Sequence, residues 1–188
     1  LIGIPNLTTS KALVSFADPV IFLFFGGFAL ATALHIQKLD RKIAMWIISL
    51  SGSNLGVAAL ALFAVTALLS MWISNTATAA MMLPLALGLL THLDQNKERN
   101  TFCFVLLGIA YSASIGGLGT LVGSPPNAIA AKALEIDFAG WMKYGLPMML
   151  AMLPLMLISL YVVLRPNLNR KVHIEHEDIP WTPTRIAT

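Results

Sequence analysis

The stretch SMWISNTATAAMML, residues 70–83, places three consecutive polar residues, Ser74, Asn75 and Thr76, between two apolar arms. The surrounding residues 43–93 contain no Asp, Glu, Lys or Arg. Such flanks are typical of helices that face lipid or lie buried in protein, where an unpaired hydrogen-bonding group costs free energy. The polar triplet is therefore the first candidate for a functional site in this chain.

The composition indicates a membrane protein. Of the 188 residues, 57% are hydrophobic and 11% are charged, whereas a soluble domain carries roughly 25% charged residues. The net charge is only +3, and the basic residues cluster beside apolar segments, which is typical of membrane topology and not of nucleic-acid binding. The chain starts at Leu1 without signal-peptide features and ends in a polar segment. We therefore expect a piece of a longer protein.

The apolar segments predict a series of helices, since a bilayer core of about 30 Å needs roughly 20 apolar residues per crossing. A first span is expected at residues 19–36, with Asp18 as its N-cap. Further elements are expected as follows: an interfacial helix at 43–51, two apolar arms at 56–73 and 77–90, a helix at 101–113, a short helix at 126–134 and a last span at 141–164. Residues 116–127 hold four glycines and two prolines, so no helix should continue straight through them.

The positive charges fit one topology. Basic side chains collect on the cytoplasmic side of membranes, and nine can be placed there: Lys38, Arg41, Lys42, Lys97, Arg99, Arg165, Arg170, Lys171 and Arg185. Three then lie outside: Lys11, Lys132 and Lys143. The two arms around the triplet must then return to the side they left, which a re-entrant hairpin and two full spans both satisfy. The short triplet favours a hairpin whose tip stays in the membrane, because an aqueous loop usually carries more polar residues.

The two polar breaks have the chemistry of an ion site. Non-helical backbone is tolerated at membrane depth only inside protein or beside a water-filled cavity. A helix that ends there presents free carbonyl groups to a cation, and a helix that begins there presents N–H groups to an anion. Secondary transporters build their binding sites from such discontinuous helices. Hard oxygen ligands at both breaks favour Na⁺, with an oxyanionic substrate nearby.

Neither break contains an ionisable side chain. Proton coupling normally needs a titratable group in the membrane, so the sequence favours sodium coupling. Other interpretations remain open at this point. A lone Ser-Asn-Thr is most often an ordinary helix cap, and Gly-Pro breaks are often simple kinks, which would leave a structural membrane subunit. An intramembrane enzyme is the weakest alternative, because neither break holds an acid–base pair or a metal cluster.

Two motifs together resemble a known family. The segments SNTATAAMMLPLA, residues 74–86, and GIAYSASIGGLGTLVGSPPNAIA, residues 108–130, are similar to those of the divalent anion:sodium symporter family, in particular its bacterial dicarboxylate transporters. The likeness extends along nearly the whole chain. It implies two inverted repeats, each with a re-entrant hairpin, in a homodimer with a scaffold domain and a moving, elevator-like transport domain. By that pattern this chain is most of the N-terminal repeat.

The resemblance also implies roles for particular residues. The first sodium site would use the Ser70 and Asn75 side chains and carbonyl groups near Ser74 and Gly123. The substrate carboxylate would meet these residues: Ser74, Asn75, Thr76, Ser124 and Pro125. Thr120 and Asn127 are weaker candidates for the ion site.

The resemblance divides the chain into functional segments. Residues 1–55 would form a scaffold span and interfacial helix, 56–93 the re-entrant hairpin, 94–134 a broken helix, 135–166 the last span of the repeat and 167–188 a cytoplasmic linker. The expected protein is a multi-pass carrier of the inner membrane that couples Na⁺ to the uptake of C4 dicarboxylates such as succinate, malate or fumarate. A sodium-independent dicarboxylate exchanger and a citrate or sulfate carrier are the alternatives within the family.

Overall fold

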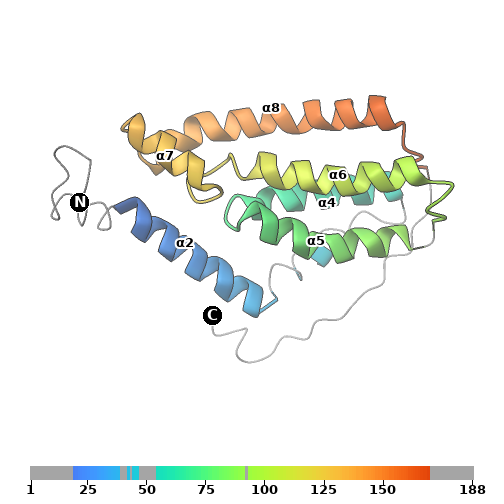
Figure 1. Cartoon of the computed structure of the whole chain (residues 1–188), viewed down its shortest axis with the longest axis horizontal. Helices are drawn as coiled ribbons and strands as arrows, with labels where there is room; N and C mark the ends of the chain where they lie inside the picture. The colour runs from blue at the N-terminus through green and yellow to red at the C-terminus, as the bar shows by residue number, and fades with distance from the viewer. Residues whose placement is uncertain (1–18, 39–41, 43, 47–53, 92, 170–188) are drawn as a thin grey trace, which may run out of the picture.

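The computed structural model shown in Figure 1 describes residues 19–38, 42, 44–46, 54–91 and 93–169. These residues form helices and contain no β-strand. The helices are α2 (Pro19–Ile36), α4 (Leu55–Ser70), α5 (Asn75–Leu90), α6 (Arg99–Gly116), α7 (Pro125–Ala133) and α8 (Phe138–Leu164). The predicted all-α architecture is therefore confirmed for this part of the chain. Most of the expected interfacial helix at 43–51 and of the linker at 167–188 lies outside the described residues.

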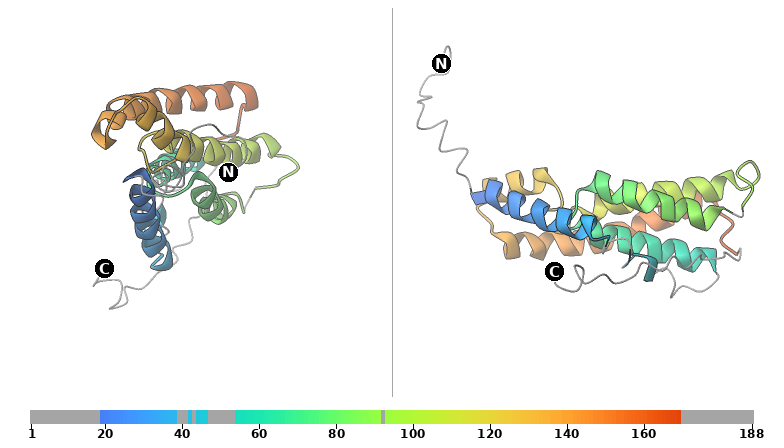
Figure 2. Two further views of the ribbon diagram at one scale, coloured as in Figure 1. Left: turned by 60° about the vertical axis from the view of Figure 1, so that its left-hand side comes forward. Right: turned by 90° about the horizontal axis from the view of Figure 1, so that it is seen from below.

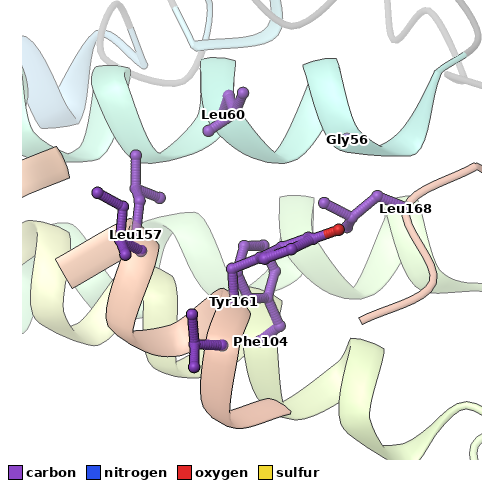
Figure 3. Close-up of a pocket in the computed structure, with 8 residues that line it drawn as sticks. Gly56, Leu60, Phe104, Leu157, Tyr161 and Leu168 are labelled. Carbon is purple, nitrogen blue, oxygen red and sulfur yellow. The ribbon is translucent and has the colours of Figure 1, made fainter. Parts of the chain in front are cut away.

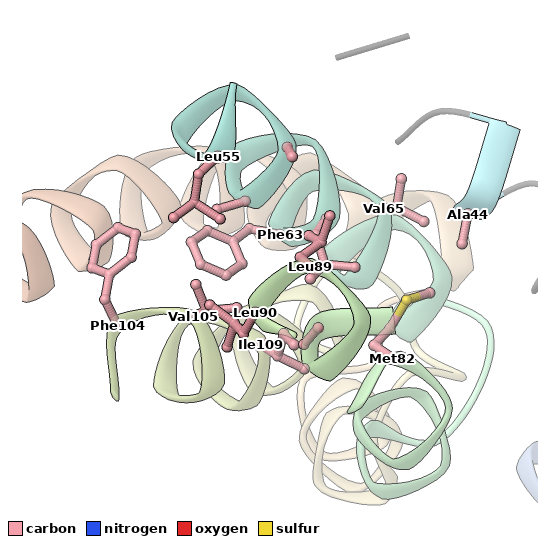
Figure 4. Packing of buried hydrophobic residues seen from close by; sticks show 14 of the residues in the cluster. Ala44, Leu55, Phe63, Val65, Met82, Leu89, Leu90, Phe104, Val105 and Ile109 are labelled. Atoms are coloured by element: carbon pink, nitrogen blue, oxygen red, sulfur yellow. The ribbon is translucent and has the colours of Figure 1, made fainter. Parts of the chain in front are cut away.

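Helix α6 is the centre of a four-helix bundle, because it packs against α4, α5 and α8. Helices α4 and α5 run side by side as a helical hairpin, and α8 lies along the opposite side of α6 (Figures 1 and 2). Between α4, α5 and α6 lies the main apolar core, shown in Figure 4, in which the rings of Phe63 and Phe104 meet at 5.6 Å between centroids. Tilted ring pairs at this separation are a favourable aromatic geometry.

The described helices begin and end close to their predicted positions, with two instructive differences. The first arm ends at Ser70, three residues earlier than expected, and the second begins at Asn75, two residues earlier. Asn75 can begin the helix because the Ser74 hydroxyl accepts a hydrogen bond from the Ala77 N–H at 3.3 Å, which caps the first turn. The polar triplet is thus divided between a cap and the first helical turn. The residues between the arms, 71–74, are hereafter the hairpin tip.

Helix α8 has the length and the apolar composition of a membrane-spanning helix. It is the one helix among the described residues that has both. Of its most apolar stretch of 18 residues, only 17% is buried inside the structure. Large apolar side chains such as Leu155, Ile158 and Val163 are more than half exposed. A continuous apolar surface of this kind marks a face that contacts lipid or protein, and α8 therefore supports the membrane location predicted from composition.

Candidate functional site

The hairpin tip meets a second interrupted region of the chain. Helix α6 ends at Gly116 and α7 begins at Pro125, so residues 117–124 form an unwound stretch between them. In Figure 1 the hairpin tip and this stretch lie at the same end of the bundle. The Thr120 hydroxyl joins the two directly, since it donates to the carbonyl oxygen of Met71, and beside this bond the Ser70 hydroxyl contacts the Ala113 carbonyl of α6. The two breaks predicted from the sequence therefore form one structural unit.

Three oxygen atoms gather where α4, α5 and α6 meet. The Ser70 Oγ lies 2.7 Å from Asn75 Oδ1 and 2.6 Å from the carbonyl oxygen of Ala113. A serine hydroxyl carries one proton, so it can donate to only one of these two acceptors at a time. The cluster is thus richer in lone pairs than in protons. Such a group of neutral oxygens suits a hard cation, which takes carbonyl, amide and hydroxyl oxygen as ligands.

Thr120 and Asn127 hold the unwound stretch in shape. The Thr120 hydroxyl donates to the Met71 carbonyl and accepts from the Gly123 N–H at 3.2 Å. The Asn127 amide nitrogen donates to the carbonyl oxygens of Gly117 and Thr120, at 2.7 and 2.8 Å. Both side chains are buried. Their bonds satisfy backbone groups that the broken helix would otherwise leave without partners, which is costly away from water.

Two glycines permit the close approach of these elements. An added Cβ atom at Gly117 would lie 2.3 Å from Asn75 Oδ1, and one at Gly123 would lie 2.5 Å from the Gly117 carbonyl oxygen. Contacts this short between a side chain and its neighbours do not occur without displacement of one of them. The glycines in the second motif therefore let the unwound stretch fold onto the Asn75 amide.

The predicted site residues fall into a buried and an accessible group. Ser70, Thr120, Gly123 and Asn127 are buried, and Asn75 is half-buried beside them. Ser74, Thr76 and Pro125 are exposed, and Ser124 is half-buried at the start of α7. The hydrogen bonds given above link the buried group in two sets, Ser70 with Asn75, and Thr120 with Gly123 and Asn127. Among the described residues, no hydrogen bond joins Ser74 or Thr76 to Ser124.

Sequence reasoning missed the contributions of Ala113, Met71 and Trp141. The first two act through backbone carbonyl groups, whose direction depends on how α4 crosses α6 and not on side-chain type. Trp141, in the first turn of α8, donates from its indole Nε1 to the Leu118 carbonyl at 3.0 Å. A tryptophan at the start of an apolar span is an ordinary interfacial residue, so the sequence held no signal for this contact.

The site is electrically neutral in its described part. Residues 54–91 contain no Asp, Glu, Lys or Arg, and neither does the unwound stretch. No group of three or more His, Cys, Asp or Glu side chains that could hold a metal ion occurs among the described residues. Two further hydroxyls near the tip, those of Thr78 and Ser112, are buried without a hydrogen-bond partner in the described part of the chain. The arrangement can therefore offer oxygen lone pairs and peptide dipoles, without formal charge, to an ion.

Comparison with known proteins places this chain in a family of transporters. The family of citrate transporters matches residues 1–181. An uncharacterized transporter of Haemophilus influenzae is 60% identical over 97% of this chain and 40% of its own length. Another, of Methanocaldococcus jannaschii, is 45% identical over 86% of this chain and 36% of its own length. The sodium-dependent dicarboxylate transporter SdcS of Staphylococcus aureus is 34% identical over 87% of this chain and 34% of its own length.

These findings confirm the resemblance seen in the two motifs, and the family and these relatives are transporters, not enzymes. The chain spans between 34% and 40% of the length of these relatives. Together with the exposed apolar face of α8, the match over nearly the whole chain identifies a membrane protein. The chain belongs to the citrate transporter family.

Proposed function

We propose that this chain contributes the first half of the binding site of a sodium-coupled dicarboxylate carrier. The observation that carries the proposal is the cluster of Ser70, Asn75 and Ala113 oxygens, in which the Ser70 Oγ lies 2.7 Å from Asn75 Oδ1 and 2.6 Å from the Ala113 carbonyl of α6. The relative SdcS, described as a sodium-dependent dicarboxylate transporter, supports sodium as the coupled ion and a dicarboxylate as the substrate. The C4 acids succinate, malate and fumarate are the dicarboxylates that we propose.

Sodium would bind at the buried oxygens, and the substrate would bind at the accessible polar groups. Ser70, Asn75 and the nearby carbonyl groups supply neutral ligands for the ion. A substrate carboxylate would then approach the exposed side, where Ser74 and Ser124 are the N-cap residues of α5 and α7. The N-terminus of α5 favours an anion there, because its first N–H groups lack intrahelical acceptors. Helix α7 begins with Pro125 and Pro126, which have no N–H, so it offers the Ser124 hydroxyl and its helix dipole instead. A bound cation would add positive charge next to the anion, which couples the two binding events.

The lengths of α4 and α5 support a re-entrant hairpin. Each has 16 residues, which corresponds to about 24 Å at 1.5 Å per residue. That length is shorter than the roughly 30 Å hydrocarbon core. In this proposal the hairpin enters and leaves on the cytoplasmic side of the inner membrane of a multi-pass protein. The hairpin, α6 and α7 would belong to a moving transport domain of an elevator-type homodimer, and the segment before residue 56 to its scaffold.

Uptake of labelled succinate into proteoliposomes, by the transporter that carries this chain, tests the proposal. We expect uptake to follow an inward sodium gradient and to fall to background when potassium replaces sodium. Asn75→Ala should lose most of the sodium-driven uptake, because it removes one oxygen of the cluster. Uptake that is indifferent to the sodium gradient would exclude symport, and counterflow without sodium would indicate an exchanger.

Citrate is the second candidate substrate, and the family description favours it. Both substrates present carboxylates, so the site described above suits either. Competition distinguishes them, since an excess of unlabelled succinate should abolish labelled uptake in a dicarboxylate carrier while citrate has little effect. The reverse order of potency would assign the chain to a citrate carrier.

A further inference from the structure

A groove of about 300 Å³ lies on the bundle at the end opposite the hairpin tip. It is lined by residues of α4, α6 and α8 and by the segment after α8, namely Gly56, Leu60, Phe104, Leu157, Ile158, Tyr161, Val162 and Leu168. The volume is at the lower end of the range of small-molecule sites in proteins. Tyr161 is the one lining residue with a polar side-chain atom. The lining therefore suits a hydrocarbon and offers almost nothing to a polar ligand.

The groove faces the surroundings of the bundle. Three lining residues on the membrane-length helix α8 are more than half exposed: Ile158, Tyr161 and Val162. Leu168 closes one end, since an added Cβ atom on Gly56 would lie 3.2 Å from the Leu168 Cβ. The Asn167 N–H donates to the Thr101 hydroxyl at 3.0 Å and so fixes this segment to α6. The groove is thus a defined concavity beside a surface that supports a membrane location.

A positively charged residue, Arg165, follows α8 next to the lining residue Tyr161, to which its backbone is bonded. Arg165 is exposed and stands in sequence between Tyr161 and Leu168, which both line the groove. Its backbone N–H donates to the Tyr161 carbonyl at 2.9 Å, in a left-handed conformation with φ of 46°. In Figure 3 the Tyr161 hydroxyl points toward Leu168, at the closed end. An apolar channel with a hydroxyl at one end and a cationic residue next to its lining is complementary to an amphiphile with an anionic headgroup.

We propose that this groove is a binding site for an anionic phospholipid. One acyl chain occupies the groove, and the headgroup phosphate contacts Arg165. Basic residues where a helix leaves the membrane attract anionic lipids, and the predicted topology places Arg165 on the cytoplasmic side. The lipid supplies the apolar and the anionic part in one molecule. The site lies away from the hairpin tip, so it is independent of the proposed transport function.

Native mass spectrometry, in mild detergent, of the transporter that carries this chain tests this site. The transporter is incubated with phosphatidylglycerol or with phosphatidylcholine of identical acyl chains. We expect phosphatidylglycerol to bind about fivefold more tightly, the preference that one basic residue supplies at a membrane surface. Arg165→Gln should abolish this preference. The matched control is Lys143→Gln, because Lys143 is also exposed on α8 but lies near the opposite end of the helix.

A large side chain that fills the groove tests whether an acyl chain binds there. Leu60→Trp should lower the occupancy of both lipids severalfold, whereas Leu150→Trp, at an exposed residue of α8 outside the groove lining, should not. Equal binding of the two lipids to the unmodified transporter, or equal effects of Arg165→Gln and Lys143→Gln, would overturn the headgroup assignment. A Leu60→Trp variant that keeps its lipids but loses a dimer signal would show that a second copy occupies the groove. Because Arg165→Gln leaves the apolar packing intact, it tests the proposal even if Leu60→Trp fails to fold.

Discussion

Replacing Thr120 with valine tests whether the hairpin tip and the unwound stretch form one unit. Valine keeps the shape of threonine but removes the hydroxyl, which donates to the Met71 carbonyl and accepts from the Gly123 N–H. Both backbone groups belong to buried residues, and neither gains a new partner from the substitution. The variant therefore tests the polar link without opening a cavity.

The expected loss follows from the two groups that lose their partner. A buried polar group left unsatisfied costs about 1–3 kcal/mol, so Thr120→Val should destabilise the chain by about 2–6 kcal/mol. Thr66→Val is the matched control, because Thr66 is equally buried but its hydroxyl donates only to the Leu62 carbonyl of its own helix, at 2.6 Å. That carbonyl keeps its helical N–H donor, so the control should lose no more than about 1 kcal/mol.

Thermal unfolding in detergent, followed by intrinsic tryptophan fluorescence, measures both variants. For a chain of this size 1 kcal/mol corresponds to about 2–4 °C in Tm, so Thr120→Val should unfold at least about 4 °C below the unmodified chain. Sodium should also protect Thr120→Val less than it protects Thr66→Val. Equal Tm values and equal sodium protection for the two variants would show that Thr120 does not hold the hairpin tip and the unwound stretch together.

Three further substitutions probe single contacts. Gly117→Ala should weaken apparent sodium affinity in uptake assays, because the added Cβ displaces the Asn75 amide. Gly88→Ala is the control and should leave the affinity unchanged, because open space surrounds Gly88. Equal sodium affinities in the two variants would contradict the proposed contact of Gly117 with Asn75. Trp141→Phe should lower Tm by a few degrees through loss of the 3.0 Å bond to Leu118, and an unchanged Tm would show that the bond is dispensable. Thr78→Val should raise Tm, since it removes a buried hydroxyl without a partner; a lower Tm would mean that this hydroxyl is used.

The helices of the bundle could largely be predicted from the sequence, because apolar runs between Gly, Pro and polar clusters set their limits. Residues 19–36 form the predicted helix without change, and α8 begins three residues before its expected start. That earlier start follows from the Asp137 side chain, which accepts from the Gly140 N–H at 2.7 Å and caps the helix. The membrane-embedded course of the hairpin stays a prediction.

The candidate site could be predicted in its side chains but not in its backbone. Ser70 and Asn75 were expected to share one ion site, and they lie within 2.7 Å of each other; their role as ligands stays a prediction. Thr120 and Asn127 are the weaker candidates for the ion site in the sequence. In the structure Thr120 links the tip to the unwound stretch, and Asn127 links that stretch to the start of α7. The Ala113 carbonyl could not be foreseen, because every residue has one and only helix packing selects which of them faces Ser70.

The central claim is that Ser70, Asn75 and Ala113 supply oxygen ligands to sodium. The sodium dependence of thermal stability, compared between the unmodified transporter and Asn75→Ala, tests it most directly. A ligand that binds the folded state stabilises it by an amount that grows with its concentration, to about 2.7 kcal/mol at one hundred times its Kd. The transporter that carries this chain should therefore melt at a higher temperature in sodium chloride than in potassium chloride of equal ionic strength. Asn75→Ala should lose most of this difference, because the sodium site in this half of the transporter is removed. A sodium-specific stabilisation of undiminished size in Asn75→Ala would contradict the assignment of the Ser70, Asn75 and Ala113 oxygens as a sodium site.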